Sequence, residues 1–399
     1  MEQMLVRGLG LSELAPRLVQ SEIRAMTAEC DRIGGVNLAQ GVCDTEVPAV
    51  VLEGAIAAMR GGQNIYTRMD GIERLRRAIA AKVQRTHGLE VDPEREVMVA
   101  SGATGAFHAA AMALLNPGDE VLLFEPFYGY HVSMFSSLRV VSVAVPLVAP
   151  DWALDLAAVR AAITPRTRAM VVNTPSNPAG KVFTRAEIEG LAEIAAEFDL
   201  FIFTDEIYEH FVYTKQDGGA AEHVSPATVE GMRERTILMS GFSKTFSVTG
   251  WRLGYLIADA KWMGAINYFH DLLYVCAPAP LQHGVADGLE QLPESFYTGL
   301  AAEHEVKRGM LLEALQGAGM RPQVPDGAYY ILAEVSGLEG ATAAEKARML
   351  LARTGVAAVA GSAFFGSGSG KGEDLLRFCF AKKDVDLAEA CRRLGGLGS

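Results

Sequence analysis

Cysteine is scarce in this chain, and its few cysteines are not spaced for a shared structural role. The 399 residues include five, at widely separated positions, and no Cys-x-x-Cys pair occurs: Cys30, Cys43, Cys276, Cys379 and Cys391. The odd number and the scatter argue against a disulfide framework and against a zinc site, so we expect no bound metal. Such cysteine use is typical of the reducing cytoplasm, where we expect the protein to act.

The sequence also lacks a long basic run and a long apolar run. The formal net charge is −12, and duplex nucleic acid is bound through cations that neutralise phosphates, so we expect no nucleic-acid partner. The longest apolar stretches, such as residues 109–115, are too short to span a bilayer. The first residues carry an early acid and no apolar core of signal-peptide length. We therefore expect a soluble intracellular protein with no membrane partner.

What is present is an alternation of apolar segments and helical patterns that begins near residue 96. Half of the residues are hydrophobic, and the length suffices for a large core and two domains. The predicted strands are 96–100, 121–124, 139–145, 169–173, 200–204 and 236–240, and the helices between them 103–115, 127–138, 154–163 and 185–198. The strands are apolar without alternation, which indicates burial on both faces. Strands interleaved with helices in this way predict a mostly parallel, helix-covered sheet.

Outside this region the pattern differs. Residues 1–45 suggest an arm with a short helix, and 50–60 and 71–84 have helical spacing. After residue 260 the predicted helices are 261–276, 279–292, 295–317 and 384–394, and the predicted strands 329–334, 356–360 and 375–380. We expect a smaller α+β domain joined by a long helix. The glycine-rich segment 366–372 is predicted to be a flexible surface loop, and its single Lys371 does not make it a Walker A motif.

Lys244 lies among small and hydroxyl residues in the run Ser240–Tyr255, and Arg252 follows eight residues later. This combination suggests an amine nucleophile beside an anion-binding pocket. Lysine amines form Schiff bases with carbonyl compounds, and pyridoxal phosphate is such a compound with a phosphate attached. For an isolated Ser-Lys-Thr, a buried or snorkelling lysine is the more frequent outcome. The other segments therefore decide between the two readings.

A phosphate site is suggested at the junction Gly102–Gly105, which follows a predicted strand and opens a helix. Such a junction offers free backbone N–H groups and the positive end of a helix dipole. With Ser243 and the forked donors of Arg252 it would form a three-sided cup for a phosphate. Small residues at this position equally allow a tight strand–helix turn.

Polar side chains also follow the predicted strands. Asp205 emerges at the end of one strand, where ligands bind in open α/β sheets, and could keep a pyridine nitrogen protonated. It could equally be a helix N-cap, and Tyr208 could be a core tyrosine rather than a donor to a ring oxygen. Asn177, held before a proline, could contact a cofactor ring oxygen and a substrate carboxylate, although Asn-Pro alone is only a turn signal.

Two further residues carry open alternatives. Tyr128, after another strand, could stack on a planar ring or pack in the core. Arg377 is a charge inside an apolar strand and needs a partner or a ligand. A bidentate grip on a substrate α-carboxylate would satisfy it, and so would a structural salt bridge.

Taken together, these segments resemble the fold-type I pyridoxal-phosphate enzymes, and among them the class I/II aminotransferases of the aspartate, aromatic and kynurenine kind. The resemblance runs from about Ser21 to Leu394. It depends on several segments in the family's order: Leu38–Gly41 with Pro48, Tyr66–Arg68, Ser101–Thr104, Glu125–Tyr128, Asn173–Gly180, Asp205–Tyr208, Ser243–Phe246 with Gly250–Arg252, and Leu376–Phe378.

The resemblance implies a seven-stranded, mostly parallel sheet between helices in a large cofactor-binding domain of residues 46–285. Residues 1–45 and 286–399, from both ends of the chain, would form the smaller domain. It also implies a homodimer in which Tyr66 reaches into the neighbouring subunit's site. Lys244 would carry the cofactor as a Schiff base and act with Asp205 and Tyr208 in catalysis. The other implied contacts are Gly102, Ala103, Thr104, Ser243 and Arg252 to the phosphate, Tyr128, Asn177 and Tyr208 to the ring, and Gly41, Asn177 and Arg377 to the substrate.

Two departures from the family pattern are present. Gly241 stands where many members have a serine, and the early loop reads Gly-Val-Cys-Asp-Thr-Glu where relatives often have Pro-Asp. That loop lies near the substrate side chain in the family, so the resemblance does not extend to an aspartate preference. Phe364, Phe365 and Tyr128 suggest aromatic or medium apolar side chains instead.

The expected activity is transfer of an amino group from an L-amino acid to a 2-oxo acid by a ping-pong mechanism. A C–S β-lyase, or another enzyme that forms an α-carbanion, would use the same residues. A cofactor-binding regulatory domain is a third reading, which the acidic charge and the short N-terminal segment disfavour.

Overall fold

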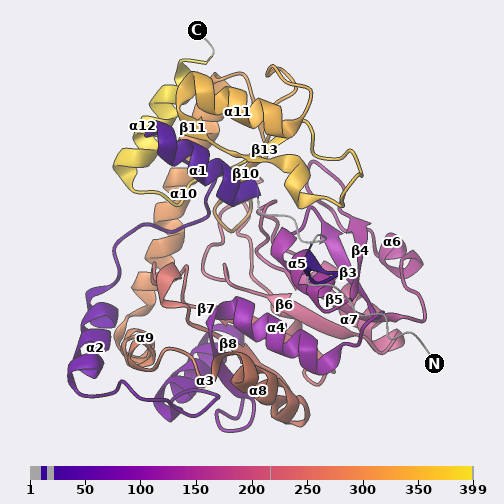
Figure 1. Cartoon of the computed structure of the whole chain (residues 1–399), viewed down its shortest axis with the longest axis vertical. Helices are drawn as coiled ribbons and strands as arrows, with labels where there is room; N and C mark the ends of the chain where they lie inside the picture. The colour runs from indigo at the N-terminus through magenta and orange to yellow at the C-terminus, as the bar shows by residue number, and fades with distance from the viewer. Residues whose placement is uncertain (1–9, 16–21, 216, 398–399) are drawn as a thin grey trace.

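The computed structural model describes residues 10–15, 22–215 and 217–397 (Figure 1). Part of the predicted N-terminal arm, residues 1–9 and 16–21, lies outside the described residues. Two layered regions are visible in Figure 1: a large sheet with helices around it, and a smaller region that holds α1, α11 and α12. The long helix α10 (Glu294–Gly317) runs from one towards the other and packs against α12 (Asp384–Gly395).

The large sheet has seven strands in the order β2-β8-β7-β6-β5-β3-β4. Their bounds are β2 (Val97–Ala100), β3 (Glu120–Glu125), β4 (Val141–Pro146), β5 (Thr167–Asn173), β6 (Phe201–Asp205), β7 (Thr236–Gly241) and β8 (Gly254–Ile257). Only β8 is antiparallel to its neighbours, β2 and β7. The predicted α/β class and mostly parallel seven-stranded sheet are confirmed. The sequence pattern predicted six of these strands. It missed β8, which has four residues and begins two residues after Arg252.

Helices cover both faces of this sheet because its strands, except the largely exposed edge strand β4, are apolar and buried on both sides. In β5, Ala169 and Val171 pack with α4 (Gly102–Leu114) and α8 (Ala260–Tyr274), whereas Met170 and Val172 pack with α7 (Arg185–Glu197). The remaining helices of this region are α2 (Ala49–Arg60), α3 (Glu73–His87), α5 (Gly129–Ser137), α6 (Leu156–Ala161) and α9 (Ala279–Gln291). Alternate side chains of one strand therefore join two different cores, which explains the unalternating sequence.

The smaller region contains a four-stranded antiparallel sheet in the order β12-β13-β10-β9, and a short parallel pair, β1 with β11. Its elements are α1 (Glu22–Ile33), β1 (Val36–Asn37), β9 (Arg321–Pro322), β10 (Tyr330–Glu334), α11 (Ala343–Thr354), β11 (Val356–Ala357), β12 (Val359–Ala360) and β13 (Leu375–Cys379). The predicted single strand 356–360 is in fact two, since β11 pairs with β1 and β12 pairs with β13. Helix α11 was not predicted. The domain boundaries stay a prediction.

The glycine-rich segment 366–372 is exposed at residues 367–371, as predicted. It is nevertheless anchored to the buried Glu125 at the end of β3. The Gly366 N–H donates to Glu125 Oε1 at 2.6 Å, and Lys371 Nζ lies 2.8 Å from Glu125 Oε2. Among the helices of the described ranges, none has the length and apolar character needed to cross a membrane.

Candidate active site

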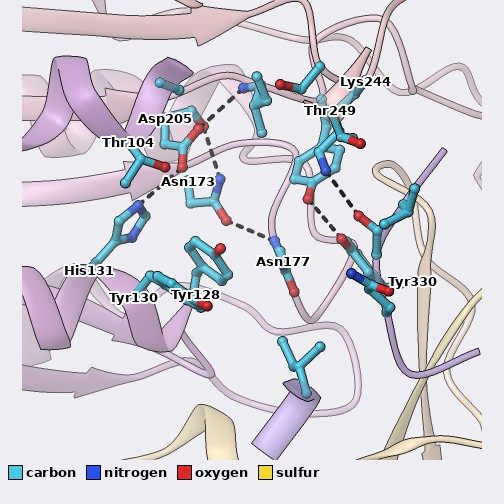
Figure 2. Close-up of a pocket in the computed structure, with 18 of the residues that line it drawn as sticks. Thr104, Tyr128, Tyr130, His131, Asn173, Asn177, Asp205, Lys244, Thr249 and Tyr330 are labelled. Atoms are coloured by element: carbon cyan, nitrogen blue, oxygen red, sulfur yellow. Dashed lines mark hydrogen bonds and ion pairs between the residues drawn. The ribbon is translucent and has the colours of Figure 1, made fainter. Parts of the chain in front are cut away.

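A cavity of about 830 Å³ lies at the carboxyl ends of the parallel strands (Figure 2). Asn173 ends β5, Asp205 ends β6 and Met239 lies in β7, and all three line it. The smaller region contributes Tyr330 from β10 and Arg377 from β13. Parallel strands present their carboxyl ends at one edge, where ligands bind in open α/β folds. Most of the residues singled out from the sequence therefore meet in one place.

Lys244 projects into this cavity from the segment after β7. Its Nζ donates to the backbone oxygen of Gly41 at 3.0 Å and lies 5.9 Å from the centre of the Tyr329 ring. No carboxylate lies within ion-pair distance of Nζ among the residues that the structure describes. Burial, opposed by Cys379 and Cys43 and assisted by Arg252, lowers the pKa of Lys244 to about 8. A substantial fraction of this amine is neutral near physiological pH, as a nucleophile or base requires.

Asp205 is held by a residue that the sequence did not indicate. His131 of α5 places its Nε2 3.1 Å from Asp205 Oδ2, and its ring stacks on Phe107 of α4 with centres 4.6 Å apart. The backbone oxygen of Asp205 accepts from the Asn173 side chain at 3.0 Å. A lone histidine in a helix, 74 residues from its partner, gives no sequence signal. The arrangement orients a carboxylate towards the cavity.

The N-terminus of α4 and Arg252 converge on one side of the cavity. Within the described residues, no side chain caps the first N–H groups of α4, and Ala103 and Thr104 of its first turn line the cavity together with Ser243. Gly102 has φ +74°, and a Cβ there would lie 2.6 Å from Arg252 Nη2. Arg252 itself has φ +55°, an uncommon value for a side chain of this size. Free amides, a hydroxyl and a guanidinium together suit a phosphate.

Arg377 is fully buried and has only neutral partners. Its Nη1 donates to Asn177 Oδ1 at 2.8 Å and its Nη2 to the Ala39 oxygen at 2.6 Å. Tyr330 and Phe364 lie on it, with ring centres 4.4 and 4.9 Å from Cζ, and Nε has no partner among the described residues. A buried cation without an acid is costly, so the site suits an anionic ligand. The structural salt bridge considered from the sequence is absent from the described part of the chain.

Aromatic side chains form the rest of the wall. Tyr208 and Tyr330 share a hydrogen bond of 2.9 Å between their hydroxyls, and Tyr128 stacks on Tyr130 at 5.2 Å. Figure 2 shows Tyr128 and Tyr130 side by side near His131. Phe364 and Phe365, from which apolar substrates were inferred, are not among the residues that line the cavity. Phe364 packs on Arg377 instead.

Gly41 and Tyr66 complete the predicted set. The Gly41 oxygen accepts from Lys244, and a Cβ at Gly41 would lie 1.9 Å from the Tyr330 hydroxyl, so only glycine fits there. Tyr66 does not line the cavity; its side chain is 78% exposed in the loop between α2 and α3. Its predicted role in a neighbouring subunit is not tested within one chain.

One group of possible metal ligands lies outside the cavity. Ligand atoms of His87, Glu206 and His223 lie within 4.8 Å of one another. All three already have protein partners: His87 lies 2.9 Å from Glu209, His223 lies 2.9 Å from Glu206, and Glu206 also accepts from Ser225 at 2.6 Å. The expectation that no metal is bound stays a prediction.

Known proteins match the chain over nearly its whole length. A family model described as "Aminotransferase class I and II" matches residues 33–394. A probable N-succinyldiaminopimelate aminotransferase of Mycobacterium tuberculosis is 38% identical over 382 residues, 93% of this chain and 94% of that protein. Mouse kynurenine–oxoglutarate transaminase 3 is 35% identical over 384 residues, 89% of this chain and 83% of that protein. The solved structure of N-succinyldiaminopimelate aminotransferase from Mycobacterium tuberculosis superposes with a TM-score of 0.92 at 37% identity, over 98% of this chain and 100% of that one.

Proposed function

The chain belongs to the aminotransferase class I and II family, and from this premise we propose that it transfers amino groups through Lys244, Asp205 and Arg377 of the described cavity. Membership confirms the predicted enzyme class, a transaminase, and the predicted cofactor, pyridoxal phosphate. Relatives of this kind act on amino acids and 2-oxo acids. The roles of individual residues, the ping-pong order of the reaction and the choice of substrate remain proposals.

The cavity fits this cofactor on observations of its own. The uncapped N-terminus of α4, Ser243 and Arg252 suit its phosphate, and Asp205, oriented by His131, suits its pyridine nitrogen. We assign Tyr208 and Asn177 to the ring oxygen and Tyr128 to the ring face. When bound, pyridoxal phosphate supplies an electron-accepting ring that stabilises negative charge at the substrate α-carbon. A carboxylate at the ring nitrogen strengthens that effect by keeping the nitrogen protonated.

Lys244 is the proposed proton carrier. Its amine has a pKa of about 8, so deprotonation near neutral pH requires little free energy. Nζ would take the α-proton of the substrate and hold it until it is returned two atoms away, beyond the substrate nitrogen. The Gly41 oxygen, 3.0 Å from Nζ, holds the amine in place without neutralising it.

Arg377 is the proposed receptor of the α-carboxylate. Its guanidinium is buried, has no acid partner in the described residues and keeps Nε free. Asn177, 2.8 Å from Nη1, would turn from guanidinium partner to carboxylate partner as the substrate arrives. The fixed carboxylate would then align the α-proton with Lys244.

The observation that carries the proposal is a pair of cations, the part-buried Lys244 and the fully buried Arg377, which line one cavity and have only neutral partners among the described residues. A C–S β-lyase or another α-carbanion enzyme would use the same residues, and the activities named for the relatives favour transamination. A homodimer with Tyr66 contributed across the interface is part of the proposal; the exposure of Tyr66 supports it. Location in the cytoplasm stays a prediction from cysteine use.

The test is Lys244→Ala against Lys261→Ala, an exposed lysine that pairs with Glu234 at 3.0 Å outside the cavity. The holoenzyme is mixed with each of twenty amino acids, and the cofactor absorbance and the 2-oxo acid product are followed. We expect Lys244→Ala to lose turnover by about 10⁴-fold or more, as expected when a group serves as both nucleophile and base, and Lys261→Ala to match the unchanged protein. Transamination by Lys244→Ala at the unchanged rate would refute the assignment. Ammonia and oxo acid formed without an acceptor would favour the lyase.

A further inference from the structure

Two segments that lie far apart in the sequence are joined beside the cavity. Residues 125–128 include the end of β3 in the large sheet, and residues 361–374 connect β12 with β13 in the smaller region. Glu125 Oε1 accepts the Gly366 N–H at 2.6 Å, and the Phe127 N–H donates to the Phe364 oxygen at 2.9 Å. The proposed transamination chemistry uses neither contact.

The ion pair of Glu125 with Lys371 adds a third contact to this junction. The Glu125 side chain is 3% exposed, and Lys371, 2.8 Å from its Oε2, is the cation that pairs with it among the described residues. Gly368 and Gly370 have φ of +75° and +70°, so the chain can turn back and bring Lys371 to the acid that already accepts from Gly366. A buried carboxylate needs such partners. The glycine-rich segment is therefore attached near both of its ends.

The connection between β12 and β13 also carries Phe364, which covers Arg377. The ring centre of Phe364 lies 4.9 Å from Arg377 Cζ, and Phe364 is 2% exposed. The Phe127 bond acts on the backbone of Phe364 itself, and the Glu125 bond acts two residues further on. A guanidinium attracts a carboxylate more strongly where water is excluded. The position of this ring therefore affects how tightly Arg377 can bind an anion.

We propose that Glu125 and Lys371 are positioning residues, whose ion pair holds Phe364 over Arg377 and thereby sets the affinity for the α-carboxylate. The proposal rests on the proposed function, because it needs Arg377 to receive that carboxylate. Neither Glu125 nor Lys371 lines the cavity, so the pair acts on binding and leaves proton transfer unchanged. Its loss should raise KM with kcat unchanged, whereas loss of a merely stabilising ion pair should change neither value for the folded protein.

The experiment compares Lys371→Met with Lys261→Met, using the holoenzyme and one good amino donor. Lys261 is a matched control: its side chain is 45% exposed against 47% for Lys371, and it pairs with Glu234 at 3.0 Å outside the cavity. We expect Lys371→Met to raise KM about fivefold, the upper range for a partly exposed ion pair, with kcat within about twofold. Lys371→Arg keeps the charge and should restore KM, and Lys261→Met should match the unchanged protein.

A second readout is independent of turnover. The monocarboxylate 3-phenylpropanoate is titrated into the holoenzyme by calorimetry, and Lys371→Met should weaken its binding by the same factor as it raises KM. A double-mutant cycle isolates the pair: once Glu125→Gln has removed the acid, Lys371→Met should cause no further loss. Independent, additive losses in the two variants would contradict a role through the pair.

An unchanged KM and an unchanged carboxylate affinity in Lys371→Met overturn the proposal, as does an equal rise of KM in Lys261→Met. A lowered melting temperature without any change in KM would assign the pair to stability alone and overturn it as well. If the unchanged protein turns over no amino acid, it is the proposed function that fails. If amino acids react and neither KM nor carboxylate binding responds to Lys371, only the positioning role fails.

Discussion

Two pairs of cations in this molecule, each with one fully buried arginine, have opposite surroundings. Arg76 and Lys82 lie on α3: Arg76 is 2.7 Å from Asp70 and 3.1 Å from Glu94, and Lys82 pairs with Glu209. Arg377 and Lys244 face the cavity, and their partners are an amide oxygen and backbone carbonyls. Arg76 and Arg377 are both 0% exposed. The equal burial of the two arginines therefore says nothing about their roles, and each has an unpartnered Nε. The charge of the partners differs: acids neutralise the α3 pair, whereas the cavity pair has no acid partner among the described residues and is left for a ligand.

Of the two arginine substitutions that test this comparison, the larger effect on catalysis is expected from Arg377→Gln. Loss of the α-carboxylate receptor should lower kcat/KM by about 1000-fold, near 4 kcal/mol, as for other buried charge contacts to a ligand. The melting temperature should not fall, because the substitution removes a buried charge that no acid compensates. Steady-state kinetics and thermal unfolding of the same preparation check both parts. A lowered melting temperature with unchanged kinetics would indicate that Arg377 stabilises the fold and does not bind the substrate.

The matched substitution Arg76→Gln should act in the opposite way. It leaves Asp70 and Glu94 with Arg68 alone, which lies 2.6 Å from Asp70 at the surface. We expect a loss of about 2 kcal/mol in the free energy of unfolding, below the usual cost of breaking a buried pair because Arg68 remains. Urea denaturation measures this loss. Since Arg76 does not line the cavity, kcat/KM of the folded fraction should stay within about twofold.

A smaller effect should appear in the pH dependence of cofactor uptake by the apoprotein. Burial lowers the pKa of Lys244 to about 8, and only its neutral amine can react with an aldehyde. Because the neutral fraction rises as pH passes the pKa, the rate of attachment should increase about tenfold from pH 7 to pH 9 and then level off. Stopped-flow absorbance provides the rate. A rate still rising steeply between pH 9 and pH 10 would indicate that the pKa of Lys244 is not lowered, and would contradict this prediction.

The sequence was informative where local pattern and topology act together. Strands buried on both faces are apolar throughout, and five of the six recognised strands are of this kind. The expected burial on both faces is wrong for β4, which lies at the edge of the sheet and is largely exposed. Parallel strands bring their carboxyl ends to one edge, so Asn173 and Asp205 could be expected to meet. The roles assigned to these side chains stay predictions.

Other features depend on partners that lie far away in the chain. The split of residues 356–360 into β11 and β12 reflects two different partner strands, which no local pattern encodes. His131 contacts Asp205 only because the fold places α5 near the end of β6. The glycine-rich segment is anchored by the pair of Lys371 with Glu125. Glu125 lies some 240 residues earlier, so no local pattern indicates this pair.

The end of β6 carries two acids in succession that face opposite ways. Asp205 lines the cavity, whereas Glu206 is sealed on the other side by Thr204, Ser225 and His223 at 3.0, 2.6 and 2.9 Å. A strand that paired one residue out of register would move every side chain one place along, so that Glu206 would take the place of Asp205 and Ile207 the place of Glu206, or Thr204 and Asp205 would do so in the other direction. In either case the cavity would lose Asp205. Pairing of Phe203 with Ile237 during folding thus determines which carboxylate meets the cofactor, and accurate strand alignment is a condition of activity as much as of stability.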